Sequence, residues 1–354
     1  MSNVISAFQY YFGRYPENED VIASHEGMSG GNFDAMRENF SLSEEYRQNY
    51  FTVTKPRNGT FFRPMQDGVK ICVLGNCQGP NIAMAIASLA QAPVSVCGLE
   101  IMDFSETSGE MASIIKDADY VVACKTYNEN YKSVSPDYIR SEYGKKTFEY
   151  SPVHFTGLQP DILVLGHYGQ RIRGPLGDYN SRVVLSAFCR GMTVSECVGA
   201  FNEDTYQRAA YFAEFGWSRD TMLQREAALD EDGLRIADWF LDNIRRTPLL
   251  YSVNHPNSRV FAHFAQLILS KIGVPARRMP VDMIPNTLAS QVIWPVAPEL
   301  ARANGVGYDT DLAYWCNNVM LNLDEMVWRS YKTYETLGRD FLIEAMGERA
   351  INFG

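Results

Sequence analysis

The sequence of 354 residues has no closely spaced pair of cysteines and no long hydrophobic run. Its seven cysteines are scattered, odd in number and without a CxxC pair. This argues against a disulfide framework and a structural metal site, and favours a reducing, cytoplasmic setting. The most apolar window, residues 82–99, is interrupted by Pro93 and by polar residues, so we expect no membrane span. The first residues also lack the basic start of a secretory signal.

Positive charge is in short supply as well. Lysine and arginine number 32 against 42 acidic residues, which gives a net charge of −10. A sequence-independent nucleic-acid binder needs a basic face, so we expect no nucleic-acid partner. The balance still allows an anionic small ligand held by a few local arginines. An apolar content of 46% with 21% charged residues is typical of a folded globular protein.

The first part of the chain, residues 1–62, predicts a small helical module. Apolar residues recur at helical spacing near residues 8–12 and 33–40, and Ser41 can cap a further helix. Residues 52–64, which are rich in proline and glycine, predict a linker.

From residue 66 to residue 354 the pattern predicts an α/β domain. Nearly continuous apolar strands alternate with amphipathic helices, which is typical of a mostly parallel sheet with helices on both faces. The expected parallel strands cover residues 69–75, 93–99, 118–125, 160–166 and, returning late in the chain, 249–253. Residues 185–247 predict a helical insertion within this domain.

The turn GNCQGP follows the first of these strands and contains Cys77. Open α/β sheets bind ligands at the carboxyl ends of their strands. We expect Gly75 and Gly79 to permit unusual backbone angles in a tight turn. Cys77 would then lie at a helix N-terminus, where the helix dipole stabilises a thiolate. The same N–H groups, with the amides of Asn76 or Gln78, could bind an oxyanion.

Two other interpretations of this turn stay open. Cys77 could be a small buried residue, as Cys72 is expected to be. The glycine-rich turn could also bind a phosphate, although GNCQGP matches neither GxGxxG nor the P-loop pattern.

A nucleophilic thiol needs a base, and the chain offers five histidines. His255 is the best candidate, because Pro256 biases it away from a helix and Asn257 can cap the helix that follows. That places His255 at the end of a late strand, at the same edge as Cys77. His167, after the strand at 160–166, is expected at this edge too. A structural role for His255 at the helix entry stays open.

Basic residues near this edge are few. Arg171 and Arg173 alternate in QRIRG, so both point to one face of an extended segment. With Lys125 they could hold a phosphorylated ligand through charge-assisted hydrogen bonds. The alternative is that all three are solvated charges.

Three stretches together resemble the WcbI family of bacterial polysaccharide biosynthesis enzymes, over residues 69–300. They are GNCQ after the first strand, MLQREAALDEDGLRIADWF, and YSVNHPNSRVFAHFAQLIL. The resemblance implies a coenzyme A-binding acetyltransferase that acts on capsular or surface glycans, with Cys77 and His255 as the catalytic pair. We assign Asn76, Gln78, Gly79, Asn254, Asn257 and His167 to the oxyanion and substrate-binding positions.

The N-terminal module is similar, through FGRYPENEDVI and SLSEEYR, to a small helical domain of unknown function in bacterial glycan and surface proteins. The similarity supports a glycan context and names no chemistry.

The expected function is therefore an acyl-CoA-dependent O-acetyltransferase with acetyl-CoA and a glycan acceptor as its partners. Cys77 could carry the acetyl group, which the sequence favours slightly, or His255 could activate the sugar hydroxyl for direct attack. The alternatives are a cysteine-dependent esterase or deacetylase, and a non-catalytic coenzyme A- or glycan-binding protein. Aromatic residues after position 300 permit a homodimer.

Overall fold

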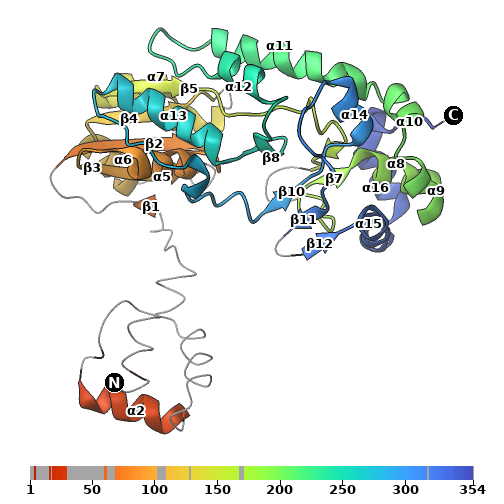
Figure 1. Ribbon diagram of the computed structural model, residues 1–354, viewed down its shortest axis with the longest axis horizontal. Helices are drawn as coiled ribbons and strands as arrows, with labels where there is room; N and C mark the ends of the chain where they lie inside the picture. The colour runs from red at the N-terminus through yellow and green to blue at the C-terminus, as the bar shows by residue number, and fades with distance from the viewer. Residues whose placement is uncertain are drawn as a thin grey trace. The chain divides into compact units, whose positions relative to one another are not determined.

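The structure, a computed structural model, describes residues 4, 16, 18–29, 60–61, 68–101, 109–126, 129–166, 171–316 and 319–353. Contacts divide the chain into two compact units, residues 1–60 and 61–354 (Figure 1). The assignment of a helical module and a catalytic domain to these units stays a prediction.

In the first unit, α2 (Glu19–Ser29) is described. It begins where the side chain of Asn18 accepts a hydrogen bond from the Val21 amide, at 3.0 Å, and acidic residues occupy its first turn. The helices expected near residues 8–12, 33–40 and after Ser41, and most of the expected linker, lie outside the described residues. The two-residue strand β1 (Thr60–Phe61) spans the boundary between the units.

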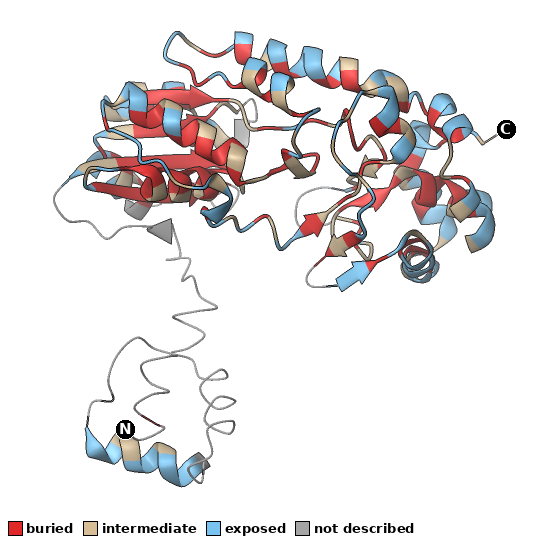
Figure 2. Cartoon of the chain, viewed as in Figure 1, coloured by how far each residue is buried: buried red, intermediate tan, exposed pale blue. Residues whose placement is uncertain are grey.

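Four parallel strands form the main sheet of the second unit, in the order β3-β2-β4-β5. They are β2 (Val69–Gly75), β3 (Val94–Glu100), β4 (Tyr120–Cys124) and β5 (Lys146–Tyr150). The strands are buried almost throughout, as Figure 2 shows, because helices cover both faces of the sheet. These helices are α5 (Gly79–Leu89), α6 (Gly109–Asp117), α7 (Pro136–Tyr143) and α13 (Ser258–Lys271).

Neighbouring side chains of β5 point to the two faces of the sheet. The Tyr150 ring packs edge-on against Phe264 of α13, with ring centroids 5.6 Å apart. The Glu149 carboxylate instead binds Arg140 of α7. Helix α5 packs against α13 on the first of these faces. The prediction of a mostly parallel sheet with helices on both faces is confirmed.

Two of the predicted parallel strands were wrong. In residues 160–166 the strand β6 (Ile162–Leu163) is short and pairs antiparallel with β7 (Asn180–Ser181), and Leu165 packs into a second hydrophobic cluster. In residues 249–253 the strand β8 (Leu250–Ser252) forms an antiparallel hairpin with β9 (His255–Pro256). The fourth parallel strand is β5, which the sequence analysis missed because its Lys and Glu interrupt the apolar pattern.

The rest of the second unit is mainly helical, with one small antiparallel sheet, and its helices pack partly in the second hydrophobic cluster and partly in the cluster that contains the parallel sheet. Its helices are α8 (Arg182–Arg190), α9 (Val194–Gly199), α10 (Glu203–Arg208), α11 (Glu214–Ala227), α12 (Ala237–Asn243), α14 (Pro298–Ala303), α15 (Leu323–Leu337) and α16 (Arg339–Met346). The sheet contains β10 (Val292–Ile293), β11 (Tyr314–Cys316) and β12 (Val319–Leu321). No helix in the described ranges has both the length and the apolarity needed to cross a membrane.

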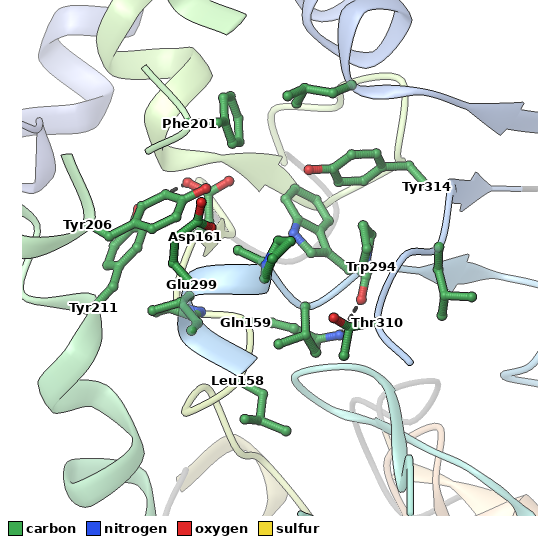
Figure 3. Close-up of a pocket in the computed structure, with 18 of the residues that line it drawn as sticks. Leu158, Gln159, Asp161, Phe201, Tyr206, Tyr211, Trp294, Glu299, Thr310 and Tyr314 are labelled. Carbon is green, nitrogen blue, oxygen red and sulfur yellow. Dashed lines mark hydrogen bonds between the residues drawn. The ribbon is translucent and has the colours of Figure 1, made fainter. Parts of the chain in front are cut away.

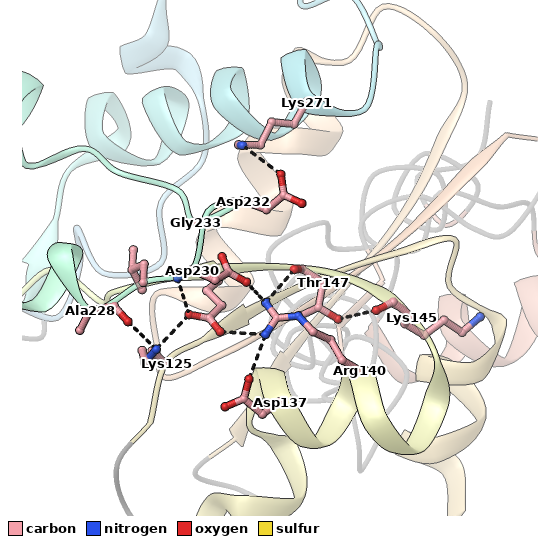
Figure 4. A network of polar contacts seen from close by, with 12 residues as sticks. Lys125, Asp137, Arg140, Lys145, Thr147, Ala228, Asp230, Asp232, Gly233 and Lys271 are labelled. Carbon is pink, nitrogen blue, oxygen red and sulfur yellow. Dashed lines mark hydrogen bonds and ion pairs between the residues drawn. The ribbon is translucent and has the colours of Figure 1, made fainter.

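A buried ion-pair network ties β5 to its surroundings (Figure 4). The Glu149 side chain is 2% exposed and accepts hydrogen bonds from Arg140 Nη1 at 2.9 Å and Lys125 Nζ at 3.2 Å. Burial acts to raise the pKa of Glu149, but the hydrogen bonds from Arg140 and Lys125 outweigh it, and the pKa is lowered. Lys125 also donates to the Ala228 carbonyl oxygen at 2.6 Å, which fixes the end of α11 against the sheet.

We expect Glu149→Gln to lower the free energy of unfolding by about 3 kcal/mol at pH 7, because it leaves two cations without their buried counter-charge. Asp137→Asn is the matched control, since Asp137 pairs with the same Arg140 but is 87% exposed, and we expect a much smaller change. A lowered carboxyl pKa stabilises the fold at neutral pH, and this contribution is lost as pH falls through the lowered pKa. Urea unfolding at pH 7 and pH 4 measures the loss of unfolding free energy in each variant and how that loss depends on pH. Equal losses for the two variants would contradict this role.

Candidate functional site

Cys77 lies in the short connection between the end of β2 and the start of α5. In the strand order β3-β2-β4-β5, the chain passes from β2 to its neighbour β3 in one direction across the sheet. It passes from β4 to its neighbour β5 in the opposite direction. The carboxyl ends of β2 and β4 therefore flank a topological switch point, where open α/β sheets bind their ligands. The sequence placed Cys77 at this edge for the same reason.

Gly75 is required at this turn by close packing rather than by its backbone angles. Gly75 and Gly79 are not among the glycines with positive φ, so the expected unusual backbone conformation was wrong. A Cβ atom on Gly75 would lie 2.0 Å from the Tyr150 hydroxyl oxygen, whereas one on Gly79 would meet its nearest atom at 3.5 Å. The absence of a side chain at Gly75 lets the turn lie directly against β5.

Gln78 ties this turn to the segment that carries His255. Its side chain is fully buried, and its Nε2 donates to the carbonyl oxygens of Val153 at 2.7 Å and Asn254 at 3.0 Å. Its Oε1 accepts from the Val153 amide at 2.9 Å. The side-chain amide of Gln78 is thus committed to structural hydrogen bonds. Asn76 differs, because among the described residues only its Oδ1 is engaged, accepting from the Gln78 amide at 3.0 Å.

His255 is held by Tyr179. The Tyr179 hydroxyl lies 3.0 Å from His255 Nε2 and donates to Asn254 Oδ1 at 2.5 Å. Because that hydroxyl has one proton, it accepts from His255, which assigns the imidazole proton to Nε2. The other nitrogen, Nδ1, is buried and has no hydrogen-bond partner among the described residues. His255 therefore carries an unused lone pair on Nδ1.

Cys77 and His255 line one cavity of about 450 Å³. Its walls also include Asn76, Glu100, Arg171, Gly177, Asp178, Tyr179, Asn254, Gln291, Val292 and Cys316. Five of the residues singled out from the sequence are thus brought together: Asn76, Cys77, Arg171, Asn254 and His255.

His167 lies outside the described residues, and the other candidates are not among the described residues that line this cavity. Gln78 is committed to its structural hydrogen bonds, and Gly79 is the first residue of α5. Asn257 caps α13 by accepting from the Arg259 amide at 3.0 Å. Lys125 belongs to the network around Glu149.

Arg171 and Arg173 bind the same carboxylate. Arg171 Nη1 and Arg173 Nε each lie 3.0 Å from an oxygen of Asp178. Arg171 reaches the cavity wall, whereas Arg173 is 79% exposed and lies outside the lining. A phosphate bound here would have to compete with Asp178 for both guanidinium groups.

Burial shifts the pKa values of the two central residues in opposite directions. Burial, reinforced by the negative charge of Glu100, raises the pKa of the Cys77 thiol to about 12. The expected stabilised thiolate was therefore wrong, because desolvation outweighs the position before a helix. Burial lowers the pKa of His255 to about 4. At neutral pH the cavity contains a thiol and a neutral imidazole.

Neither Glu100 nor Tyr179 was predicted from the sequence as a residue of this cavity. Glu100 is the last residue of β3, the strand beside β2. The last residues of the strands next to β2 were therefore a signal in the sequence that pointed to Glu100. Tyr179 lies in an irregular segment with no periodic signal, and its position follows only from the fold.

The fold and site define an α/β protein in which Cys77, in the turn after β2, and His255 line one cavity. Comparison with known proteins agrees with this description. The family model of the polysaccharide biosynthesis enzyme WcbI matches residues 70–277, more than half of the chain. The chain belongs to the WcbI family of polysaccharide biosynthesis enzymes. A search of curated proteins gives no match.

A solved structure of WcbI, described as a novel polysaccharide biosynthesis enzyme, is similar to this chain with a TM-score of 0.61. The match covers 80% of this chain and 95% of that one, at 16% sequence identity, so the likeness shows the fold. That structure is described as the native protein without a disulfide bond between coenzyme A and one of its cysteines.

We expect Gly75→Ala to destabilise the protein by about 1–3 kcal/mol, because its methyl group overlaps the Tyr150 hydroxyl. Gly79→Ala is the matched control and should cost much less. The Tyr150 hydroxyl has no hydrogen-bond partner among the described residues, so Tyr150→Phe alone should cost little. Thermal denaturation of the single and double variants gives the coupling between the two sites. Failure of Tyr150→Phe to recover part of the Gly75→Ala loss would refute the close-packing argument.

Proposed function

We propose that this chain is an acyl-CoA-dependent O-acetyltransferase that modifies a bacterial capsular or surface polysaccharide or its precursor. The observation that carries the proposal is the shared cavity of Cys77 and His255, which come from distant parts of the sequence. Membership of a polysaccharide biosynthesis family supports a glycan acceptor. The similar WcbI structure, described as the native protein without a disulfide bond between coenzyme A and one of its cysteines, supports an acyl-CoA donor.

The cavity residues suit the thioester end of acetyl-CoA. Asn76, Asn254 and the Cys77 thiol are uncharged, the Arg171 guanidinium is paired with Asp178, and Glu100 is the other charged residue in the described lining. A thioester is neutral and needs hydrogen-bond donors near its carbonyl oxygen. The side-chain amide of Asn76 can supply one, because its Nδ2 has no hydrogen bond to another described residue. The coenzyme supplies the activated acetyl group when it is bound.

The protonation states favour direct transfer over an acetyl-cysteine intermediate. In direct transfer, a sugar hydroxyl oxygen attacks the thioester carbonyl while His255 Nδ1 accepts the hydroxyl proton. The carbon–sulfur bond then breaks, and the coenzyme leaves as a thiol after taking that proton. Tyr179 positions His255 by accepting its Nε2 proton in a hydrogen bond. An acetyl-cysteine route would require ionisation of a thiol with a pKa of about 12, beside Glu100.

We expect His255→Gln to lower the rate of acetyl transfer by about 100- to 10,000-fold, because it removes the general base. Cys77→Ala should lower the rate by less than tenfold. Saturating coenzyme A should raise the melting temperature of the wild type and of both variants, since binding does not need the base. His263→Gln, which changes a histidine stacked on Trp239 outside the cavity, is the matched control.

The assay measures release of coenzyme A from acetyl-CoA in the presence of methyl glycosides, with intact-protein mass spectrometry of the same samples. An acetyl adduct on Cys77 that forms and decays during turnover would overturn direct transfer. Absence of any thermal shift with coenzyme A, with activity on acetyl esters instead, would identify a hydrolase.

The pH dependence of transfer provides a separate test of His255. Its pKa of about 4 leaves the imidazole neutral at pH 5.5, whereas an ordinary histidine with a pKa of 6.5 would be mostly protonated there. A base acts in its unprotonated form, so we expect kcat/KM to change less than twofold between pH 8 and pH 5.5. A roughly tenfold fall over this range would indicate an unshifted histidine.

A further inference from the structure

A second cavity, of about 360 Å³, lies between β6, α10 and the segments that follow β10 (Figure 3). Five aromatic residues line it: Phe201, Tyr206, Tyr211, Trp294 and Tyr314. The charged residues among its described lining are all acidic, namely Asp161, Glu299 and Asp311. Without lysine or arginine in this wall, the cavity is unsuited to phosphates or carboxylates.

Two deeply buried side chains present hydrogen-bond acceptors that the protein does not use. Asp161 is 7% exposed, and its Oδ1 accepts from the Tyr211 hydroxyl and the Val183 amide, each at 2.9 Å. Gln159 is 4% exposed, and its Nε2 donates to the Trp294 carbonyl oxygen. The second oxygen of each, Asp161 Oδ2 and Gln159 Oε1, is buried without a hydrogen-bond partner among the described residues. Such unpaired acceptors call for donors from a ligand.

The aromatic rings stand around these acceptors. Tyr206 and Tyr211 stack with centroids 5.6 Å apart, and Trp294 meets Tyr314 edge-on at 5.3 Å. In Figure 3 the two stacked tyrosines lie on one side of Asp161 and Trp294 lies on the other. A ligand in this cavity would meet apolar ring surfaces and, in the wall, the side chains of Asp161 and Gln159 that carry the two unpaired acceptors. This combination suits a sugar ring, which has apolar C–H faces and hydroxyl donors.

A cationic ligand would also be attracted to aromatic rings and carboxylates, but the surroundings of Asp161 disfavour it. The Arg182 guanidinium lies 5.8 Å from the centre of the Tyr211 ring, and its positive charge acts on Asp161. Burial raises the pKa of Asp161 despite the hydrogen bonds that this carboxyl group accepts and the Arg182 charge, so the charged carboxylate that a cation would need is disfavoured. A neutral hydroxyl donor needs no further negative charge.

The second cavity is a neighbour of the cavity that contains Cys77. Val292 of β10 pairs with Cys316 of β11, and both line the Cys77 cavity. Two residues along each strand, Trp294 and Tyr314 line the second cavity. Side chains two residues apart in extended chain share a face, and two residues span roughly 7 Å. The two cavities therefore follow one another along one face of the small sheet.

We propose that the second cavity is a saccharide subsite that binds an uncharged sugar ring of the acceptor glycan, through Asp161, Gln159 and the aromatic wall. The identification of the sugar as part of an acceptor rests on the proposed acetyltransferase function. The sugar ring stacks on the aromatic side chains, and its hydroxyl groups donate to Asp161 Oδ2 and Gln159 Oε1. A neighbouring ring of the same chain then extends toward Cys77 and His255.

The test measures binding of methyl glucoside, methyl galactoside and methyl mannoside to the full chain. Saturation-transfer NMR titration gives the affinity for each glycoside. We expect Asp161→Asn to weaken binding of the preferred glycoside at least tenfold, because it replaces the acceptor Oδ2 with a donor. Leu312→Arg is a second variant, at a side chain that is 57% exposed on the cavity wall, so it tests the site without disturbing the core. His263→Gln, at a histidine that stacks on Trp239 and lines neither cavity, is the control and should bind the glycoside as the wild type does.

The outcomes separate this proposal from the proposed function. Glycoside binding that both Asp161→Asn and Leu312→Arg weaken supports the subsite, even if coenzyme A gives no thermal shift and the acetyltransferase proposal fails. Binding that neither variant changes, or that His263→Gln weakens as much as they do, overturns the subsite while acetyl transfer stands. Binding of tetramethylammonium in place of all three glycosides would overturn it in favour of a cation site. So would failure of every glycoside to bind at 50 mM.

Discussion

The candidate site depends on one buried amide. Gln78 accepts from the Val153 amide and donates to the carbonyl oxygens of Val153 and Asn254, so its three hydrogen bonds join the cysteine turn to two distant segments. Each of these groups would be costly to leave unpaired in the interior, which holds the segments in one arrangement. Because Asn254 directly precedes His255, the position of the imidazole relative to Cys77 follows from this contact.

The same burial that stabilises the site decides its chemistry. A thiolate–imidazolium pair needs a low thiol pKa and a raised histidine pKa, and a dry cavity shifts both in the wrong direction. Glu100 adds to this by opposing a second negative charge beside Cys77. The chain therefore keeps both groups neutral. A neutral imidazole with one nitrogen bound to Tyr179 is suited to accept a proton, whereas a buried thiol is suited to contact an apolar or sulfur-containing group.

What the sequence could predict was local. The strand before Cys77 is an unbroken apolar run that ends at Gly75, and His255 is marked by the proline that follows it, so both residues were assigned to the ligand edge. What it could not predict depends on partners far away in the chain. Glu149 makes β5 look unlike a buried strand, because its counter-charges Arg140 and Lys125 lie elsewhere. The role of Gln78 likewise depends on Val153 and Asn254.

Two cavities of different character lie next to one another in the second unit. The cavity at the parallel sheet is polar, with a thiol, amides, the Glu100 carboxylate and one guanidinium paired with Asp178, whereas the described lining of the cavity beside it is aromatic and acidic and contains no cation. Under the proposed function this contrast sorts the two substrates by charge. Acidic side chains exclude the phosphates of the coenzyme from the aromatic cavity, and a neutral sugar gains little from the paired arginine. Under the proposed function, a protein of net charge −10 can therefore use an anionic donor, because the acidic side chains of the aromatic cavity keep that donor out of the acceptor subsite.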